Sequence, residues 1–254
     1  MQDRALITDT SVREPDHIAK RLAVLEGTAI RIMDVTIAAA GLIVFLPVIL
    51  IIAMIIKMDS PGPAIFKQTR LGRDRRNSHS PQRQSRTGRT TTKTKRLHDL
   101  GGRPFVFYKF RTMHADARER FPELYHYEYD DETIKTLYFK IAEDPRLTRV
   151  GKHLRKTTLD ELPNLINVIK GDMGVVGPRP DIPEMVKYYQ SWQKKKFRLN
   201  PGVTGLAQVS GRGLLSFQET LKYDVEMVEK YGLLFNIKII LRTIKVTLLR
   251  IGAF

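Results

Sequence analysis

The longest hydrophobic segment of the chain runs from Val35 to Ile56, 22 residues that contain no charged side chain. A helix of that length can cross the apolar core of a bilayer, which is about 30 Å thick. Pro47 interrupts the segment past its middle, and a proline inside a helix removes a hydrogen-bond donor and favours a kink or break. Lys and Arg flank both ends, and the positive-inside rule then places both flanks on the cytoplasmic side. The pattern therefore predicts a helix that breaks at Pro47 and re-enters one leaflet without crossing.

Two short β-type runs, residues 64–66 and 105–108, flank a polar segment at about 74–103 and can pair across it. From Arg73 to Arg103 the chain carries ten Lys or Arg and two Asp, with almost no apolar side chain. Because such a composition cannot bury a core, the segment is predicted to be a basic disordered insertion.

The order of polar and apolar residues predicts helices over residues 115–129, 152–168 and 184–197. A last apolar stretch, residues 233–251, places three cations on one helix face, opposite apolar side chains. These cations are Lys238, Arg242 and Lys245. Such a helix can lie on an anionic membrane surface, and a core-packing helix with one wet side fits the pattern almost equally well.

Charge and composition narrow the class of partner. The formal net charge is +16 and the pI is near 10.0, so an anionic partner is expected: a phosphate-bearing substrate, acidic lipid or nucleic acid. The basic insertion has no aromatic residue for base stacking, which argues against nucleic acid. The chain has no cysteine, so it has neither disulfides nor thiolate metal sites, and a cytosol-facing protein is the natural interpretation.

Adjacent carboxylates, Asp160 and Glu161, follow the basic Arg155 closely and precede the apolar run at residues 165–169. Thr158 or Asp160 could cap a helix that starts there, and the positive end of the helix dipole would keep a carboxylate ionised. An ionised carboxylate serves as a nucleophile or a metal ligand. Taken alone, the pair would be an ordinary acidic first turn of a helix.

Its neighbours give the pair more weight. In order and spacing, five motifs resemble the bacterial sugar transferase family of monotopic phosphoglycosyl transferases, from about Arg31 to the C-terminus and apart from the basic insertion. They occupy residues 108–113 (YKFRTM), 144–151 (DPRLTRVG), 158–164 (TLDELPN), 170–180 (KGDM and GPRP) and 201–208 (PGVTGLAQ).

The resemblance implies an enzyme that transfers a sugar-1-phosphate from a UDP-sugar to polyprenyl (undecaprenyl) phosphate and releases UMP. The reaction is expected to pass through a covalent aspartyl-phosphosugar intermediate. It would be the first membrane step of O-antigen, capsule or exopolysaccharide synthesis. Phosphoryl transfer needs charge neutralisation above all, and Mg²⁺ or Mn²⁺ is the expected cofactor. The expected partners are the polyprenyl phosphate, the nucleotide sugar and anionic membrane lipids, and no nucleic acid is expected.

Residue roles follow from the same resemblance. It makes Asp160 the nucleophile and Glu161 the metal ligand, and it gives Arg155 and Lys109 as catalytic cations that hold phosphates. Arg179 stands between two prolines, a rigid frame that suits a guanidinium held at a nucleotide. The full expected substrate-binding set is Arg111, Arg179, Pro180, Thr204, Gly205, Gln208 and Arg212.

The expected architecture is α+β and mainly helical, with a re-entrant membrane helix and a small cytosolic catalytic domain that carries interfacial amphipathic helices. Residues 1–30 form a leader, residues 31–58 the membrane helix broken at Pro47, and residues 59–254 the catalytic domain with its insertion at about 74–103. The protein would be monotopic in the bacterial inner membrane, with its catalytic domain on the cytoplasmic side.

Two other functions compete with this one. A membrane-tethered basic adaptor could bind anionic lipid or nucleic acid through residues 73–103, but it would not explain the five motifs. A multi-span transferase of similar reaction would need more hydrophobic segments of membrane length than the one in this chain.

Overall fold

The computed structural model describes residues 14–74, 101–138, 141, 143–211 and 214–249 of the 254-residue chain. Residues 1–13 of the expected leader and residues 75–100 of the expected insertion lie outside this part. In chain order the elements, with η for 3₁₀ helices, are α1 Glu14–Asp59, β1 Ile65–Leu71, β2 Pro104–Phe110, α2 Ala117–Arg120, η1 Pro122–Tyr125, α3 Thr133–Thr136, α4 Arg149–Thr157, η2 Leu159–Glu161, α5 Asn164–Lys170, β3 Gly174–Val176, η3 Pro183–Tyr188, η4 Gln193–Arg198, β4 Gly202–Thr204, α6 Leu206–Gly211, α7 Phe217–Lys230 and α8 Leu233–Leu248.

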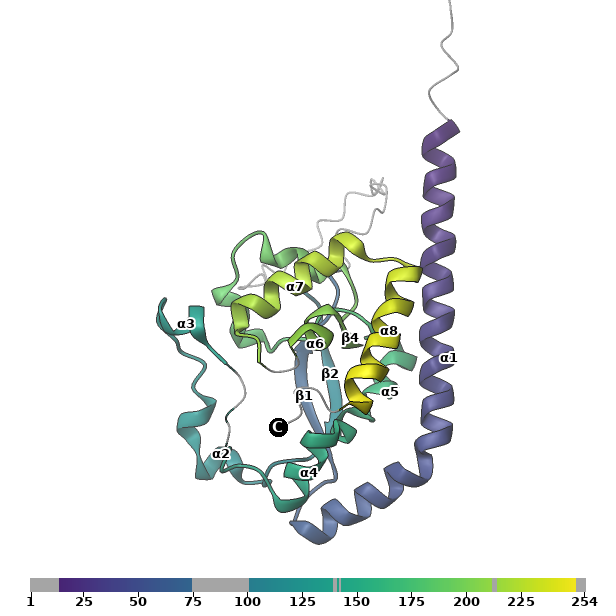
Figure 1. Ribbon diagram of the computed structural model, residues 1–254. Helices are drawn as coiled ribbons and strands as arrows, with labels where there is room; N and C mark the ends of the chain where they lie inside the picture. Colours follow the sequence, from purple (N-terminus) through teal and green to yellow (C-terminus); the bar gives the residue numbers. More distant parts are fainter. Residues whose placement is uncertain (1–13, 75–100, 139–140, 142, 212–213, 250–254) are drawn as a thin grey trace, which may run out of the picture.

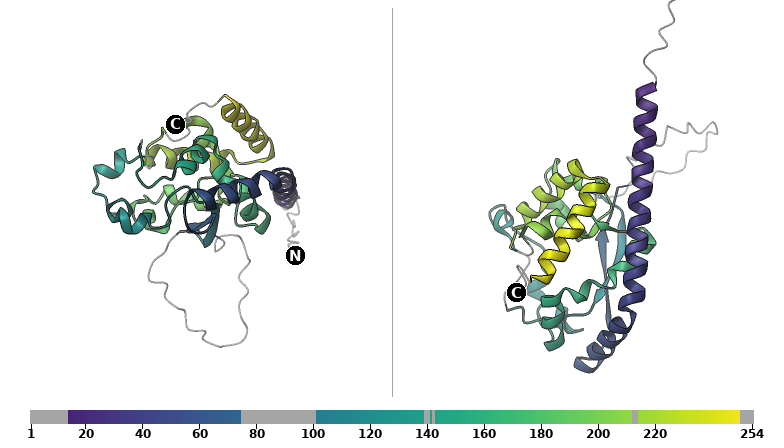
Figure 2. Two further views of the ribbon diagram at one scale, coloured as in Figure 1. Left: turned by 90° about the horizontal axis from the view of Figure 1, so that it is seen from below. Right: turned by 45° about the vertical axis from the view of Figure 1, so that its right-hand side comes forward.

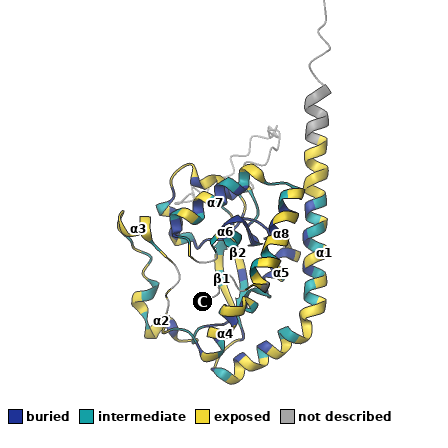
Figure 3. Ribbon diagram, viewed as in Figure 1, coloured by how far each residue is buried: buried dark blue, intermediate teal, exposed yellow. Residues whose placement is uncertain are grey.

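The first helix, α1, dominates the shape of the molecule. It runs straight past α8 and α5 and then bends sharply toward α4 (Figures 1 and 2). Pro47 lies inside the helix, which remains helical on both sides of the proline. The predicted break is therefore a bend: a proline removes one backbone donor, while its fixed φ still suits a helix. Much of α1 is exposed (Figure 3), and by length and composition it can cross a membrane.

Both ends of the apolar part of α1 are attached to the same globular body. At the first end, Asp34 accepts a hydrogen bond from the Val175 backbone at 2.9 Å, and Arg31 donates to the Val168 carbonyl at 2.7 Å. At the other end, Asp59 accepts from the backbone N–H of Val150 at 3.3 Å. The helix is thus fixed to α5 and β3 at one end of its apolar part and to α4 at the other.

The two expected β-type runs do pair. Strands β1 and β2 are antiparallel, with Ile65 opposite Phe110 and Leu71 opposite Pro104. A second, two-stranded sheet is parallel: β3 pairs with β4, and Val176 lies opposite Thr204. This parallel pair aligns the two segments that follow β3 and β4, which carry two of the sequence motifs.

Three hydrophobic clusters hold the elements together. One joins α1 to α5, β3 and α8, a second lies between η3, η4 and α7, and the third joins the end of α1 to β2 and α4. Their most buried members include Ala38 and Ile239 in the first, Met185 and Leu221 in the second, and Phe110 and Leu154 in the third. Each large apolar side chain buried in this way stabilises the fold by about 1.5–3 kcal/mol.

Three predicted helices are shorter or divided in the structure. The helix expected over residues 115–129 is the four-residue α2 followed by the 3₁₀ helix η1. The helix expected over residues 152–168 is interrupted after α4, where Thr158 adopts the left-handed conformation at φ 58°. The helix expected over residues 184–197 is two 3₁₀ helices, η3 and η4. In these places tertiary contacts override local helix preference. The α+β, mainly helical class is confirmed.

Candidate active site

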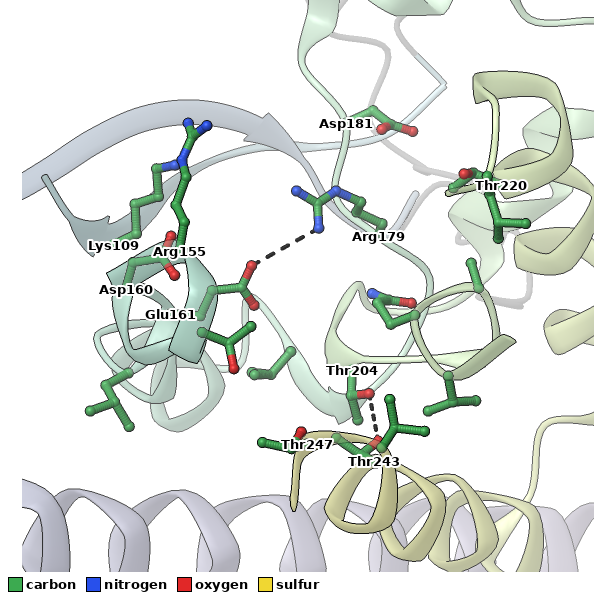
Figure 4. Close-up of a pocket in the computed structure, with 18 of the residues that line it drawn as sticks. Lys109, Arg155, Asp160, Glu161, Arg179, Asp181, Thr204, Thr220, Thr243 and Thr247 are labelled. Atoms are coloured by element: carbon green, nitrogen blue, oxygen red, sulfur yellow. Dashed lines mark hydrogen bonds and ion pairs between the residues drawn. The ribbon is translucent and has the colours of Figure 1, made fainter. Parts of the chain in front are cut away.

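A cavity of about 430 Å³ lies between two groups of elements (Figure 4). On one side are η2, β2 and α4, and on the other are the helices α6, α7 and α8. This volume is typical of small-molecule sites, which span roughly 300–1,000 Å³. One wall is charged and the opposite wall is mostly apolar. The charged and polar lining residues are Lys109, Arg155, Thr158, Asp160, Glu161, Arg179, Asp181, Thr204, Gln208, Thr220, Thr243 and Thr247.

The carboxylate pair is presented by a strained turn. Thr158 ends α4 in the left-handed region, and it is the one non-glycine residue with positive φ in the part of the chain described. This conformation costs of order 1–3 kcal/mol for such a residue and recurs at functional sites. It reverses the chain so that η2 can place Asp160 and Glu161 on the cavity. Neither Thr158 nor Asp160 caps the following helix, contrary to the sequence-based expectation, since α5 starts only at Asn164.

Three cations from three separate elements meet the carboxylates. Lys109 comes from β2, Arg155 from α4 and Arg179 from the loop after β3 (Figure 4). Arg179 Nη1 lies 3.9 Å from Glu161 Oε1, at the outer limit of an ion pair.

The buried carboxylate of Asp144 orients Arg155. Arg155 Nη1 lies 3.5 Å from Asp144 Oδ2, and the Asp144 side chain is almost completely buried. Arg146 donates to both oxygens of the same carboxylate, at 2.8 Å each. Burial alone would raise the pKa of Asp144, but hydrogen bonds from Arg146 and the charge of Arg155 hold that pKa below its usual range. Asp144 thus stays ionised and anchors Arg155.

The electrostatics of the cavity reflect burial and mutual compensation. Burial raises the pKa of Asp160, while Lys109, Arg155 and Arg179 lower it and offset part of that rise. Burial also raises the pKa of Glu161, with Arg179 opposing the rise and Asp160 adding to it. Burial lowers the pKa of Lys109 to about 8, against the pull of Asp160 toward the charged form. The site therefore combines carboxyl groups of raised pKa with a lysine of lowered pKa, as catalytic sites often do.

The opposite wall was not foreseen from the sequence. Helices α7 and α8 contribute threonine hydroxyls and apolar side chains, and the Thr204 and Thr243 hydroxyl oxygens are 2.7 Å apart. Nothing in the local pattern distinguished these residues from ordinary helix positions. Asn164 was also missed: its buried side-chain amide has no hydrogen-bond partner, and it lines a small adjoining cavity with Glu161 and Gln208.

The structure brings together most of the predicted site residues. Lining the main cavity are Lys109, Arg155, Asp160, Glu161, Arg179, Thr204 and Gln208, while Pro180 lines the small adjoining one. Gly205 has a backbone role instead, because a Cβ there would lie 2.2 Å from the Gly177 carbonyl oxygen. Arg212 lies outside the described residues.

Arg111 is a correction. It was expected to bind substrate, but its guanidinium is buried at the C-terminal end of α1 and does not line the cavity. It donates to the carbonyls of Ser60, at 2.7 Å, and of Ile56 and Pro61. The Ile56 carbonyl also accepts from the Ser60 N–H at 3.2 Å, while Ser60 and Pro61 follow the last residue of the helix. The cation at this end complements the helix dipole.

The donor set fits a hard divalent cation. Among the residues that the structure describes, no group of three or more His, Cys, Asp or Glu side chains forms a metal cluster. Mg²⁺ needs only one or two carboxylates where substrate phosphates supply the other oxygens. Glu161 meets that need, because its charge is only partly compensated by Arg179 at 3.9 Å.

Comparison with known proteins agrees with this geometry. The chain is 38% identical over 224 residues to "Galactosyl transferase CpsE" of Streptococcus agalactiae, covering 88% of this chain and 43% of that protein. It is 35% identical over 224 residues to the "UDP-glucose:undecaprenyl-phosphate glucose-1-phosphate transferase" of Caulobacter vibrioides (84% and 67%). It is also 32% identical over 228 residues to "Exopolysaccharide production protein ExoY" of Rhizobium meliloti (90% and 89%).

The extent of these matches differs between relatives. The chain spans less than half the length of the streptococcal relative, but nearly all of the rhizobial one. The sequence model of one family, described as "Bacterial sugar transferase", matches residues 25–85 and 79–250. The match includes α1 from residue 25 onward, the hairpin and every described residue that lines the cavity, and the chain belongs to the bacterial sugar transferase family.

Proposed function

We propose that the protein transfers a sugar-1-phosphate from a UDP-sugar to polyprenyl phosphate and releases UMP. The observation that carries this proposal is the meeting of two carboxylates with three cations on one cavity wall, opposite a wall of hydroxyl and apolar groups. Cations there can neutralise a diphosphate, while the second wall suits a sugar or a base. The names of the Caulobacter relative and of a similar Escherichia coli protein, both UDP-glucose:undecaprenyl-phosphate glucose-1-phosphate transferases, support the substrate classes.

In the first half-reaction, a carboxylate oxygen of Asp160 attacks the β-phosphorus of the nucleotide sugar. A bond forms between that oxygen and phosphorus, and the bond from phosphorus to the bridging oxygen breaks, so that UMP leaves with the electron pair. Lys109, Arg155 and Arg179 stabilise the negative charge on the phosphate oxygens as it shifts toward the leaving group. Asp160 is left as an aspartyl-phosphosugar.

In the second half-reaction, a phosphate oxygen of the polyprenyl phosphate attacks the same phosphorus. The bond between phosphorus and Asp160 breaks, and the carboxylate is regenerated for the next cycle. No proton needs to be added or removed if the attacking phosphate is ionised. The product is a polyprenyl diphosphate sugar, and the two half-reactions together predict ping-pong kinetics.

Glu161, with oxygens of the substrate diphosphate, would hold Mg²⁺ or Mn²⁺. The cation would supply further charge neutralisation at the phosphate oxygens. Glu161 itself keeps Arg179 directed across the cavity, through the 3.9 Å contact.

The attachment of α1 supports a re-entrant arrangement. Asp34 and Asp59 lie at opposite ends of the apolar segment, and both bond to backbone N–H groups of the same globular body. A helix crossing the bilayer would place its ends on opposite sides, where one body could reach both only by entering the apolar core. The bend of α1 and these two contacts therefore favour a monotopic protein, and the Lys and Arg residues that flank the apolar segment favour the cytoplasmic side for its site.

Donor-only incubation followed by intact-protein mass measurement tests the chemistry. The wild type should gain the mass of a phosphosugar and release one UMP per chain, whereas Asp160→Asn should do neither. Turnover with polyprenyl phosphate should fall by several orders of magnitude in that variant, because the nucleophile is lost. Chelation should stop UMP release, and Mg²⁺ or Mn²⁺ should restore it. Vesicle binding without any UMP release across a panel of UDP-sugars would favour the adaptor instead.

A further inference from the structure

A buried ion cluster lies directly behind the loop that carries Arg179. Lys196 Nζ is 2.5 Å from Asp181 Oδ2 and 2.7 Å from Asp224 Oδ2. The exposed fractions of these side chains are 2% for Lys196, 10% for Asp181 and 0% for Asp224. Two carboxylates thus share one ammonium group almost wholly out of contact with solvent.

Each acidic member of the cluster also bonds to its surroundings. Asp224 Oδ1 accepts from the backbone N–H of Arg179 at 3.4 Å. The Tyr189 hydroxyl donates to Asp181 Oδ2, and the Asp181 carbonyl accepts from the Leu71 backbone at 2.9 Å. The cluster therefore connects the Arg179 loop to η3, η4, α7 and the end of β1.

The loop lies between β3 and η3 without regular secondary structure, and the Arg179 side chain is 52% exposed over the cavity. Two contacts outside the cluster also hold the loop: the Pro178 carbonyl accepts from the Gly202 N–H at 3.0 Å, and the Pro180 carbonyl accepts from Arg70 at 3.1 Å. Between them, the N–H of Arg179 itself is held by Asp224.

Figure 4 shows the Arg179 guanidinium directed toward Glu161. An exposed side chain with few packing contacts takes its direction from its backbone. Asp224 accepts the hydrogen bond from the Arg179 backbone N–H. Two residues later, the Asp181 carbonyl accepts from the Leu71 N–H and fixes the backbone there.

Stability alone is a weak reason to keep such a cluster. Burying charges is costly, and well-packed apolar residues are often as stabilising as a buried ion pair. A cluster that holds the backbone of a phosphate-binding residue in place can also support catalysis. A small displacement of a group that contacts the reacting phosphate lowers the rate strongly.

We propose that Lys196, Asp181 and Asp224 are positioning residues for Arg179, and that they fix the guanidinium where it meets the phosphates of the donor. This inference rests on the proposed function. The three residues do not contact the reacting atoms in this proposal, and they act through the Arg179 backbone. Their loss should therefore matter only while Arg179 is present.

Asp224→Asn is the most informative variant. Asparagine keeps the shape but offers a single acceptor oxygen, which can serve either Lys196 or the Arg179 N–H. Lys196 keeps its pairing with Asp181, so one buried ammonium still faces one buried carboxylate and the protein should fold. We expect kcat/KM for the UDP-sugar to fall about 10-fold, the effect of weakening one charge-assisted contact.

A double-mutant cycle with Arg179→Ala separates positioning from general damage. In the Arg179→Ala background, Asp224→Asn should change kcat/KM by less than about 2-fold, because the group that it positions is gone. Met185→Ala is the matched control, since Met185 is fully buried in the cluster between η3, η4 and α7 but bonds to none of the three residues. It should lower the unfolding midpoint while leaving KM for the donor unchanged.

The outcomes are distinct. If Asp224→Asn lowers kcat/KM by the same factor with and without Arg179, the cluster is merely structural and the proposal is wrong. If Asp224→Asn fails to fold, Tyr189→Phe, which removes one hydroxyl donor from Asp181, goes through the same cycle, and equal factors again overturn the proposal. Absence of UMP release from the wild type would refute the proposed function. In that case UMP binding, measured calorimetrically through the same cycle, still tests the positioning of Arg179.

Discussion

The chemistry of the site depends on how Lys109 and Asp160 share charge. Burial favours the neutral form of each, lowering the pKa of Lys109 to about 8 and raising that of Asp160. Their mutual attraction opposes both effects. Burial also raises the pKa of the adjacent Glu161, and the charge of Asp160 adds to that rise.

A bell-shaped pH profile is the first prediction. The nucleophile must be ionised, so kcat/KM should rise as pH passes through the raised pKa of the carboxylate pair. It should fall again as Lys109 loses its proton around pH 8. Lys109→Met should lower kcat/KM about 100-fold and move the acidic limb to higher pH, since the ammonium that lowered the pKa of Asp160 is gone. Initial rates of UMP release from about pH 5 to about pH 10 would measure both limbs.

Lys109→Arg provides the control for charge. A guanidinium stays protonated in this range, so the acidic limb should remain near its wild-type position while the alkaline limb moves up. An acidic limb that does not move in Lys109→Met would mean that Lys109 and the carboxylates are not coupled.

At the scale of the element, Arg111 belongs to α1 rather than to the substrate. Its buried guanidinium closes the C-terminal end of that helix through three carbonyls. Arg111→Met should destabilise the protein by about 1–3 kcal/mol, because those acceptors lose a charged donor. Thermal unfolding in detergent should show a lower midpoint, with KM for the donor close to the wild-type value. A large rise in KM at unchanged stability would restore Arg111 to the binding site.

The hairpin gives a second prediction at this scale. Residues 75–100 separate β1 from β2, yet the two strands are already joined near their open end, where the Gly72 N–H donates to the Arg103 carbonyl at 2.8 Å. A short glycine-containing turn in place of residues 75–100 should therefore spare turnover in neutral detergent. Binding to anionic vesicles should weaken at low salt, because each Lys or Arg near such a surface contributes about 1 kcal/mol.

Sedimentation of the variant with vesicles at low and high salt measures that loss. The attraction is screened within roughly 8–10 Å at physiological salt, so wild type and variant should converge as salt is added. Loss of turnover in a folded variant would show that the segment reaches the active site.

At the scale of the whole molecule, the bend of α1 and its two attachments favour a topology in which both flanks of the apolar segment lie on one side of the membrane. Because the chain has no cysteine, single cysteines can report it directly. Cysteines at the exposed positions Ala23 and Glu119, before and after the apolar segment, should both react with an impermeant thiol reagent from the cytoplasmic side alone. Labelling of the two positions from opposite sides would show that α1 spans the bilayer.

Much of the fold followed from local pattern. The pairing of β1 with β2 was predicted, because two β-type runs around a polar segment have few other ways to satisfy their backbones. The helix expected through Thr158 was wrong, since its left-handed conformation is imposed by packing and no propensity predicts it. The position of Arg111 was not foreseen for a similar reason: a cation in a motif does not reveal which carbonyls it will meet.

The sequence by itself determined the long apolar segment with Pro47, the adjacent carboxylates and the excess of positive charge. These features are local or compositional, so they can be recognised without knowing which segments become neighbours. Only the tertiary structure decided which cations meet Asp160, that Asp144 lies behind Arg155, and that Lys196 lies behind Arg179. Lys109 and Arg179 lie far from Asp160 in the chain, and Lys196 lies far from Asp224. They are brought together by the parallel pairing of β3 with β4 and by long-range packing around α7, which side-chain periodicity does not encode.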